Sequence, residues 1–128
     1  MRRISTIARV LLGLIFTIFG LNGFLHFIPM AALPAGAAGD FMSALFQSHY
    51  LVVVFLLQLI AGMMLLTNSY VPLALVLIGP VIMNILLFHL FMAPGGLPLA
   101  VLNVILWTLA ALQFRRTFGG LFRYHAEA

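Results

Sequence analysis

The chain has 128 residues, of which 65% are hydrophobic and only 6% are charged, and its formal net charge at pH 7 is +4. Soluble domains carry roughly 25% charged residues, so this composition leaves too little polar surface for a water-soluble domain. It predicts an integral membrane protein. The absence of cysteine excludes disulfides, thiol redox chemistry, Cys-ligated zinc and haem attachment through Cys.

The positive charge is confined to the two ends of the chain. Its six basic residues are all arginines, namely Arg2, Arg3, Arg9, Arg115, Arg116 and Arg123. They form no basic patch interleaved with aromatic residues, so we expect no binding to nucleic acid. Arginine next to membrane spans marks the cytoplasmic side. We therefore expect a bacterial inner (plasma) membrane protein with both termini in the cytoplasm.

The first candidate span covers residues 4–28 and ends before Pro29. A signal peptide is the alternative, because arginines precede the apolar run and small residues follow it at 35–38. The run is longer than the roughly 7–15 residues of a signal-peptide core, so we expect a retained span. Arg9 lies about one turn inside this span, and we expect its guanidinium to extend to the cytoplasmic headgroups.

Three further apolar segments follow at residues 50–66, 71–92 and 97–114. Residues 29–40 are rich in Pro, Gly and Ala and suit a loop, and residues 41–49 are expected to form a short interfacial helix. Short turns between the later segments make neighbouring helices antiparallel. The sequence therefore predicts one all-α domain over residues 1–128, an integral membrane four-helix bundle with up-down-up-down topology.

Polar side chains within the predicted spans gather in the half of the bundle away from the termini. Such groups are costly in lipid unless they find a partner. Two interpretations stay open: hydrogen bonds between helices, worth about 0.6 kcal/mol each, or a polar pocket that binds a ligand. No residue is assigned a catalytic role. The candidate ligand-binding residues are Asn22, His26, Gln58, Asn84, His89 and Asn103.

Three histidines, His26, His49 and His89, lie at a similar predicted depth. Three histidines can hold zinc and leave a coordination position open. Helical geometry argues against this, because His89 lies about 140° from Asn84 and His49 lies on the face opposite Gln58. We therefore predict no metal site, and haem ligation by two histidines is equally disfavoured.

Three glycines in the first predicted span and a proline in the third are expected to affect how these helices pack. Gly13, Gly20 and Gly23 permit close approach of another helix, either within the bundle or between protomers. Pro80, after Gly79, is expected to kink the third span because it leaves a backbone carbonyl without its usual donor.

Two segments resemble the DoxX family of small four-helix membrane proteins. They are residues 8–24, ARVLLGLIFTIFGLNGF, and residues 80–98, PVIMNILLFHLFMAPGGLP. Residues 58–62, QLIAG, match a position where many relatives have Glu followed by paired glycines. The resemblance covers nearly the whole chain and implies the same four-helix fold. It also implies a link to quinone-coupled thiosulfate oxidation or to oxidoreductase complexes of oxidative stress.

This sequence departs from the family at Gln58, which replaces the acid, and at Ala61, which replaces the first paired glycine. An amide does not exchange a proton near neutral pH, so any chemistry that the acid carries in relatives is in doubt here.

Two functions are expected from these observations. The first is binding of a small lipophilic molecule in the polar pocket, or support of a membrane-protein partner. The alternative is a membrane subunit of a quinone-linked oxidoreductase system, in which Asn22, His26, Asn84 or His89 would hydrogen-bond a quinone, with electrons supplied by a partner. Four short helices bury little surface among themselves, so we also expect a homo-oligomer or a hetero-complex.

Overall fold

The computed structural model describes residues 1–125, which form helices joined by short turns and contain no strand. The all-helical prediction is confirmed for this part of the chain. The long helices are α1 (Arg2–Leu25), α3 (Tyr50–Leu66), α4 (Val71–Phe91) and α5 (Leu97–Leu112). The short elements are α2 (Ala37–Gln47), α6 (Arg115–Gly119) and the 3-10 helices η1 (Pro94–Gly96) and η2 (Gly120–Phe122).

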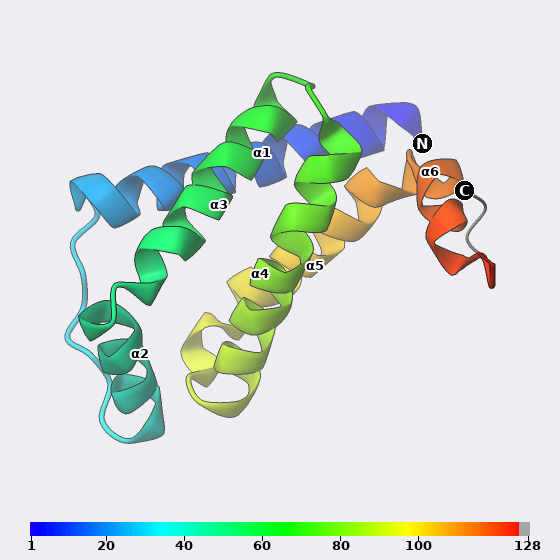
Figure 1. Ribbon diagram of the computed structural model, residues 1–128. Helices are drawn as coiled ribbons and strands as arrows, with labels where there is room; N and C mark the ends of the chain where they lie inside the picture. The colour runs from blue at the N-terminus through cyan, green and yellow to red at the C-terminus, as the bar shows by residue number, and fades with distance from the viewer. Residues whose placement is uncertain (126–128) are drawn as a thin grey trace.

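The four long helices form two limbs that meet near the chain termini and separate toward the other end (Figure 1). One limb is α1 with α3, and the other is α4 with α5. We call the end with the termini and the turn at residues 67–70 the closed end, and the end with α2 and η1 the open end (Figure 1). Leu12, Leu65 and Leu75 have no exposed surface and fill the core between the limbs. Packing therefore holds the limbs together over their closed half.

Glycines let α1 and α3 approach one another closely. A methyl group added at Gly20 would lie 2.8 Å from the backbone nitrogen of Leu59, and one added at Gly62 would lie 2.6 Å from that of Thr17. Real Cβ atoms do not come this close to backbone, so these positions require glycine. The three α1 glycines predicted to permit close packing all face α3. They therefore serve packing within the chain.

Three helical segments are long and apolar enough to cross a membrane: α1, α4, and η1 with α5 over residues 94–112. Helix α3 has 17 residues and is about 26 Å long, a little short of a hydrocarbon core of about 30 Å. Helix α2 precedes α3 at an angle of 84°, and the break falls at His49, which has a positive φ of 59°. The α2–α3 pair is a fourth candidate span with a bend.

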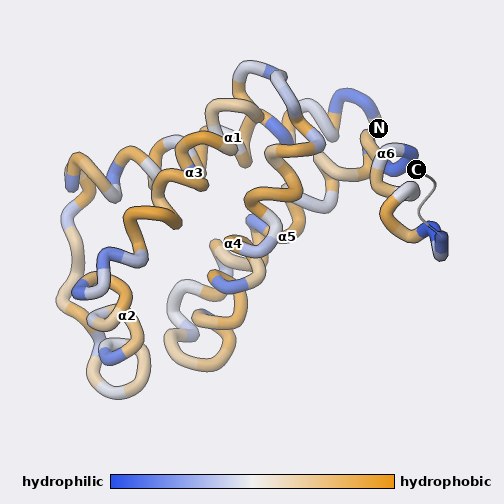
Figure 2. The backbone as a smooth tube through the Cα atoms, viewed as in Figure 1, coloured by the Kyte–Doolittle hydropathy of each residue, from blue (hydrophilic) through white to orange (hydrophobic). Residues whose placement is uncertain are grey.

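The residues of the long helices are mostly apolar, and runs of polar residues lie at the turns and the chain ends (Figure 2). Large apolar side chains are exposed on every limb, for example Val53, Met63, Val76 and Ile105. Water-soluble monomers rarely expose continuous apolar surface on this scale. The surface is that of a membrane protein.

Two polar side chains join helices at the closed half. Trp107 of α5 donates a hydrogen bond from Nε1 to the carbonyl of Leu75 in α4, at 2.9 Å. Arg9 of α1 donates from Nη1 to the carbonyl of Leu65, near the end of α3. This contact joins α1 to the last turn of α3, where the carbonyl of Leu65 also accepts the backbone N–H of Asn68 at 3.4 Å.

Candidate functional site

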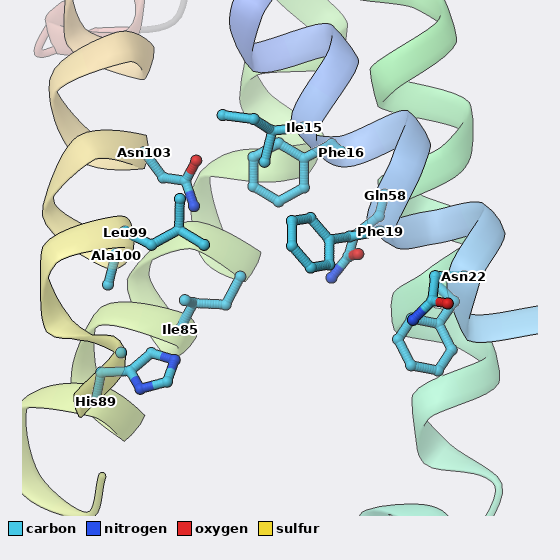
Figure 3. A pocket seen from close by; sticks show the side chains of 12 residues that line it. Ile15, Phe16, Phe19, Asn22, Gln58, Ile85, His89, Leu99, Ala100 and Asn103 are labelled. Carbon is cyan, nitrogen blue, oxygen red and sulfur yellow. The ribbon is translucent and has the colours of Figure 1, made fainter. Parts of the chain in front are cut away.

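A cavity of about 340 Å³ lies between the two limbs. Each of the four long helices contributes one polar side chain to it: Asn22 from α1, Gln58 from α3, His89 from α4 and Asn103 from α5 (Figure 3). The rest of its lining is apolar. The remaining residues are Ile15, Phe16, Phe19, Phe55, Ile85, Gly96, Leu99 and Ala100.

Gln58 and Asn103 are the two buried polar residues of the cavity, with exposed fractions of 7% and 4%. The Oδ1 atom of Asn103 is inaccessible and accepts no hydrogen bond. The amide of Gln58 likewise has no hydrogen-bond partner among residues 1–125. A buried polar group without a partner costs about 1–3 kcal/mol. That cost applies to the inaccessible Oδ1 of Asn103, whereas a ligand in the cavity would hydrogen-bond the NH2 group of Asn103 and the amide of Gln58.

His89 lies nearer the open end and presents its ring to the cavity (Figure 3). Its Nδ1 is 2.9 Å from the carbonyl oxygen of Ala93. A carbonyl can only accept, so Nδ1 carries the proton, and Nε2 of the neutral ring remains an acceptor. The ring rests on Gly96, where a methyl group would overlap it. The backbone therefore fixes both the tautomer and the position of this imidazole.

Asn22 lines the cavity near the last turn of α1 and also stabilises that end of the helix. Its Oδ1 accepts a hydrogen bond from the backbone N–H of Ile28, at 2.7 Å. The side-chain NH2 group has no hydrogen-bond partner among residues 1–125. The cavity thus holds the amides of two buried residues, an imidazole acceptor and an amide donor, and no lining residue is charged.

Four of the six predicted site residues line the cavity, and two do not. Helix α1 ends at Leu25, and His26 adopts a left-handed conformation with a φ of 51°. His26 therefore leaves the helical register that would have placed it beside Asn22, and it is exposed. Asn84 is also exposed and donates from Nδ2 to the carbonyl of Pro80, at 2.9 Å. Asn84 and His89 are about 140° apart around the helix, so they lie on different faces of α4.

The apolar lining was not predicted from the sequence, although its spacing carries a signal. Phe19 precedes Asn22 by three residues, and Phe55 precedes Gln58 by three residues. The apolar lining residues of α4 and α5 stand in the same way three or four residues before a polar one. Residues three or four apart share a helix face. The apolar lining could therefore have been predicted as the residues that lie three or four positions before each polar one.

The histidines do not converge on one point. Only His89 lines the cavity, while His26 and His49 are exposed at the ends of α1 and α3. Residues 1–125 contain no group of three or more His, Asp or Glu side chains that could hold a metal ion.

Comparisons of the chain with protein-family models, with curated proteins and with solved structures find no match. The geometry of the cavity is therefore the basis for a proposed function.

Proposed function

We propose that the protein crosses a bacterial inner membrane four times and binds a small lipophilic molecule in the cavity between its limbs. The three long apolar segments and the bent α2–α3 pair are the four spans in this proposal. The arginines at both chain ends favour an orientation with the closed end in the cytoplasm. The cavity then lies in the outer half of the membrane, and the bundle runs up-down-up-down.

The observation that carries the proposal is the pair of unpartnered amides of Gln58 and Asn103 in an apolar cavity. Small-molecule sites are mostly apolar concavities with a few convergent polar groups. If the amides served helix packing, they would hydrogen-bond to a neighbouring helix, which neither does within residues 1–125. Ligand binding accounts for them better than packing does.

Native mass spectrometry of the full chain, released from lipid nanodiscs, tests this proposal. We expect the wild type to retain a lipophilic molecule and Asn103→Leu, which keeps the volume but removes the amide, to retain much less. Asn84→Leu is the matched control, since Asn84 is exposed and lies outside the cavity. Equal retention by all three proteins would show that the cavity amides bind nothing.

A quinone-linked redox subunit is the second candidate function, consistent with the DoxX resemblance. The observation that favours it is the arrangement of hydrogen-bonding groups on both limbs, with Phe16 and Phe19 between them (Figure 3). A flat ring with a carbonyl at either end would fit donors on opposite walls. In that role Gln58 cannot transfer a proton, so the protein would hold the quinone for a redox partner. A short-chain quinone that displaces the retained molecule would favour this candidate over a general lipid binder.

Support of a membrane-protein partner is compatible with either function. The exposed apolar surface of the limbs is available to lipid, to a second copy of the chain or to another membrane protein. Masses of intact assemblies in the same spectra give the stoichiometry directly.

A further inference from the structure

We infer that the ligand is an uncharged amphiphile that enters the cavity sideways between α1 and α5, with its polar head at Gln58 and Asn103 and its apolar chain in the gap between the two helices. This inference rests on the proposed binding function and adds the route and the chemical class.

The cavity opens on the side of α1 and α5. Phe19 and Leu99, one from each helix, line the cavity and yet are 41% and 43% exposed. Every other lining residue is less exposed, and Phe16 and Ala100 beside them are buried. Helices α1 and α5 meet near the termini and diverge toward the open end (Figure 1). Apolar side chains that are both in the cavity and at the surface mark this gap as the opening.

The opposite side of the cavity, between α3 and α4, is bridged. Phe41 of α2 stacks on Phe88 of α4, with ring centroids 5.8 Å apart and planes 29° apart. Phe88 in turn packs edge-on against His89, whose ring lines the cavity. Helix α2 thus connects the two limbs at the open end. One aromatic contact spans this side, whereas no aromatic pair among residues 1–125 joins α1 to α5.

The lining determines the charge and the head group of the ligand. No Asp, Glu, Lys or Arg lines the cavity, so a charged head would be buried without a counter-ion, which is costly. Primary amides both donate and accept hydrogen bonds. Hydroxyl groups do the same, so they would accept a hydrogen bond from the NH2 group of Asn103 and pair with the amide of Gln58. An uncharged head with hydroxyl groups on an apolar chain meets all these conditions.

Photo-cross-linking tests the route and the class together. The probe is a 1-monoacylglycerol that carries a diazirine in its acyl chain, added to the full chain in phosphatidylcholine nanodiscs. Peptic peptides are then mapped by mass spectrometry. The comparison probe has the same chain and glycerol but an added phosphate, which makes it a lysophosphatidic acid. Val76, on the exposed face of α4, reports contact with bulk lipid.

We expect cross-links from the neutral probe to concentrate around Phe19 and Leu99 and to exceed those at Val76. The double variant Gln58→Leu/Asn103→Leu should lose the excess and keep the Val76 signal, whereas Asn84→Leu should keep both. Leu99→Trp fills the gap while keeping both amides in the sequence and should also lose the excess. This second variant keeps the test decisive where the double variant fails to fold.

Three results would overturn the inference: equal labelling at Phe19, Leu99 and Val76, labelling concentrated at Phe41 and Phe88, or equal labelling by the phosphorylated probe. These results are distinct from failure of the proposed function. If Asn103→Leu loses its retained molecule but labelling falls at Phe41 and Phe88, binding stands and the α1–α5 route is wrong. If no molecule is retained and no labelling depends on Asn103, both are wrong.

Discussion

Gln58 and Asn103 reach the same cavity from opposite limbs, and neither side-chain amide has a hydrogen-bond partner within residues 1–125. Native proteins hydrogen-bond most of their buried polar groups, so two unpartnered amides at one site require an explanation. A buried amide without a partner lowers the stability of the empty protein, and a ligand that hydrogen-bonds the accessible amide groups would raise it. Amides that served only helix packing would instead be hydrogen-bonded within the protein.

Replacing Asn103 by Leu is expected to leave the ligand-free protein as stable as the wild type or more stable, because the substitution removes a buried group that costs about 1–3 kcal/mol. Ligand retention should fall at the same time. Thermal unfolding of delipidated protein, followed by circular dichroism, measures the first effect, and native mass spectrometry measures the second. A lower unfolding temperature together with unchanged retention would identify Asn103 as a packing residue.

Gly96→Ala is expected to displace the imidazole of His89 from the cavity, because the added methyl group overlaps the ring. The backbone at Gly96 has a φ of −92°, which alanine adopts readily, so the effect comes from the contact with His89. Gly95→Ala is the matched control, since a methyl group there meets no atom within 4 Å. We expect weaker ligand retention in Gly96→Ala and wild-type retention in Gly95→Ala. Equal retention by the two variants would exclude His89 from binding.

Gly62→Ala is expected to destabilise the α1–α3 limb, because its methyl group would lie 2.6 Å from the backbone nitrogen of Thr17. The helices must move apart, and overpacking of this kind costs about 1–3 kcal/mol. Gly119→Ala, at a position with open space, is the control. The midpoint of unfolding in a mixed-micelle titration should fall for Gly62→Ala alone. If both variants unfold alike, the close approach of α1 to α3 does not contribute to stability.

The helices could be predicted from the sequence because apolar run length and turn residues act locally. The second predicted segment, residues 50–66, coincides with α3, and the third and fourth segments start where α4 and α5 start. Helix ends were less predictable. His26 was included in the first predicted segment because its surroundings are apolar. Helix α1 nevertheless ends at Leu25, because His26 itself adopts the left-handed conformation. The short helix α6, Arg115–Gly119, was not predicted.

The candidate site could be predicted only in part, because it depends on how the limbs are oriented. Helix periodicity separates Asn84 from His89, but it does not say which of the two faces the other limb. The structure places His89 at the cavity and turns Asn84 outward, where its own helix satisfies it. The break before α3 agrees with the short helix predicted ahead of residue 50, but the contact of Phe41 with Phe88 joins distant segments, and no local pattern encodes it.

The orientation in the membrane gives a last prediction, which concerns charge alone. Arg2 and Arg3 at one chain end and Arg115 and Arg116 at the other are all exposed and lie at the closed end. Replacing these four by Gln should reduce the fraction of molecules with both termini in the cytoplasm, because arginine in short flanking segments sets orientation.

Reporter enzymes fused to the C-terminus, one active only in the cytoplasm and one only outside it, measure this fraction. Replacing Arg9 alone is the control, since its guanidinium is engaged with the carbonyl of Leu65 inside the fold. An outward C-terminus in the wild type would place the cavity in the cytoplasmic half of the membrane, and the ligand would then have to come from the inner leaflet. Because the two limbs separate only at the open end, the orientation of the chain decides which leaflet supplies the cavity.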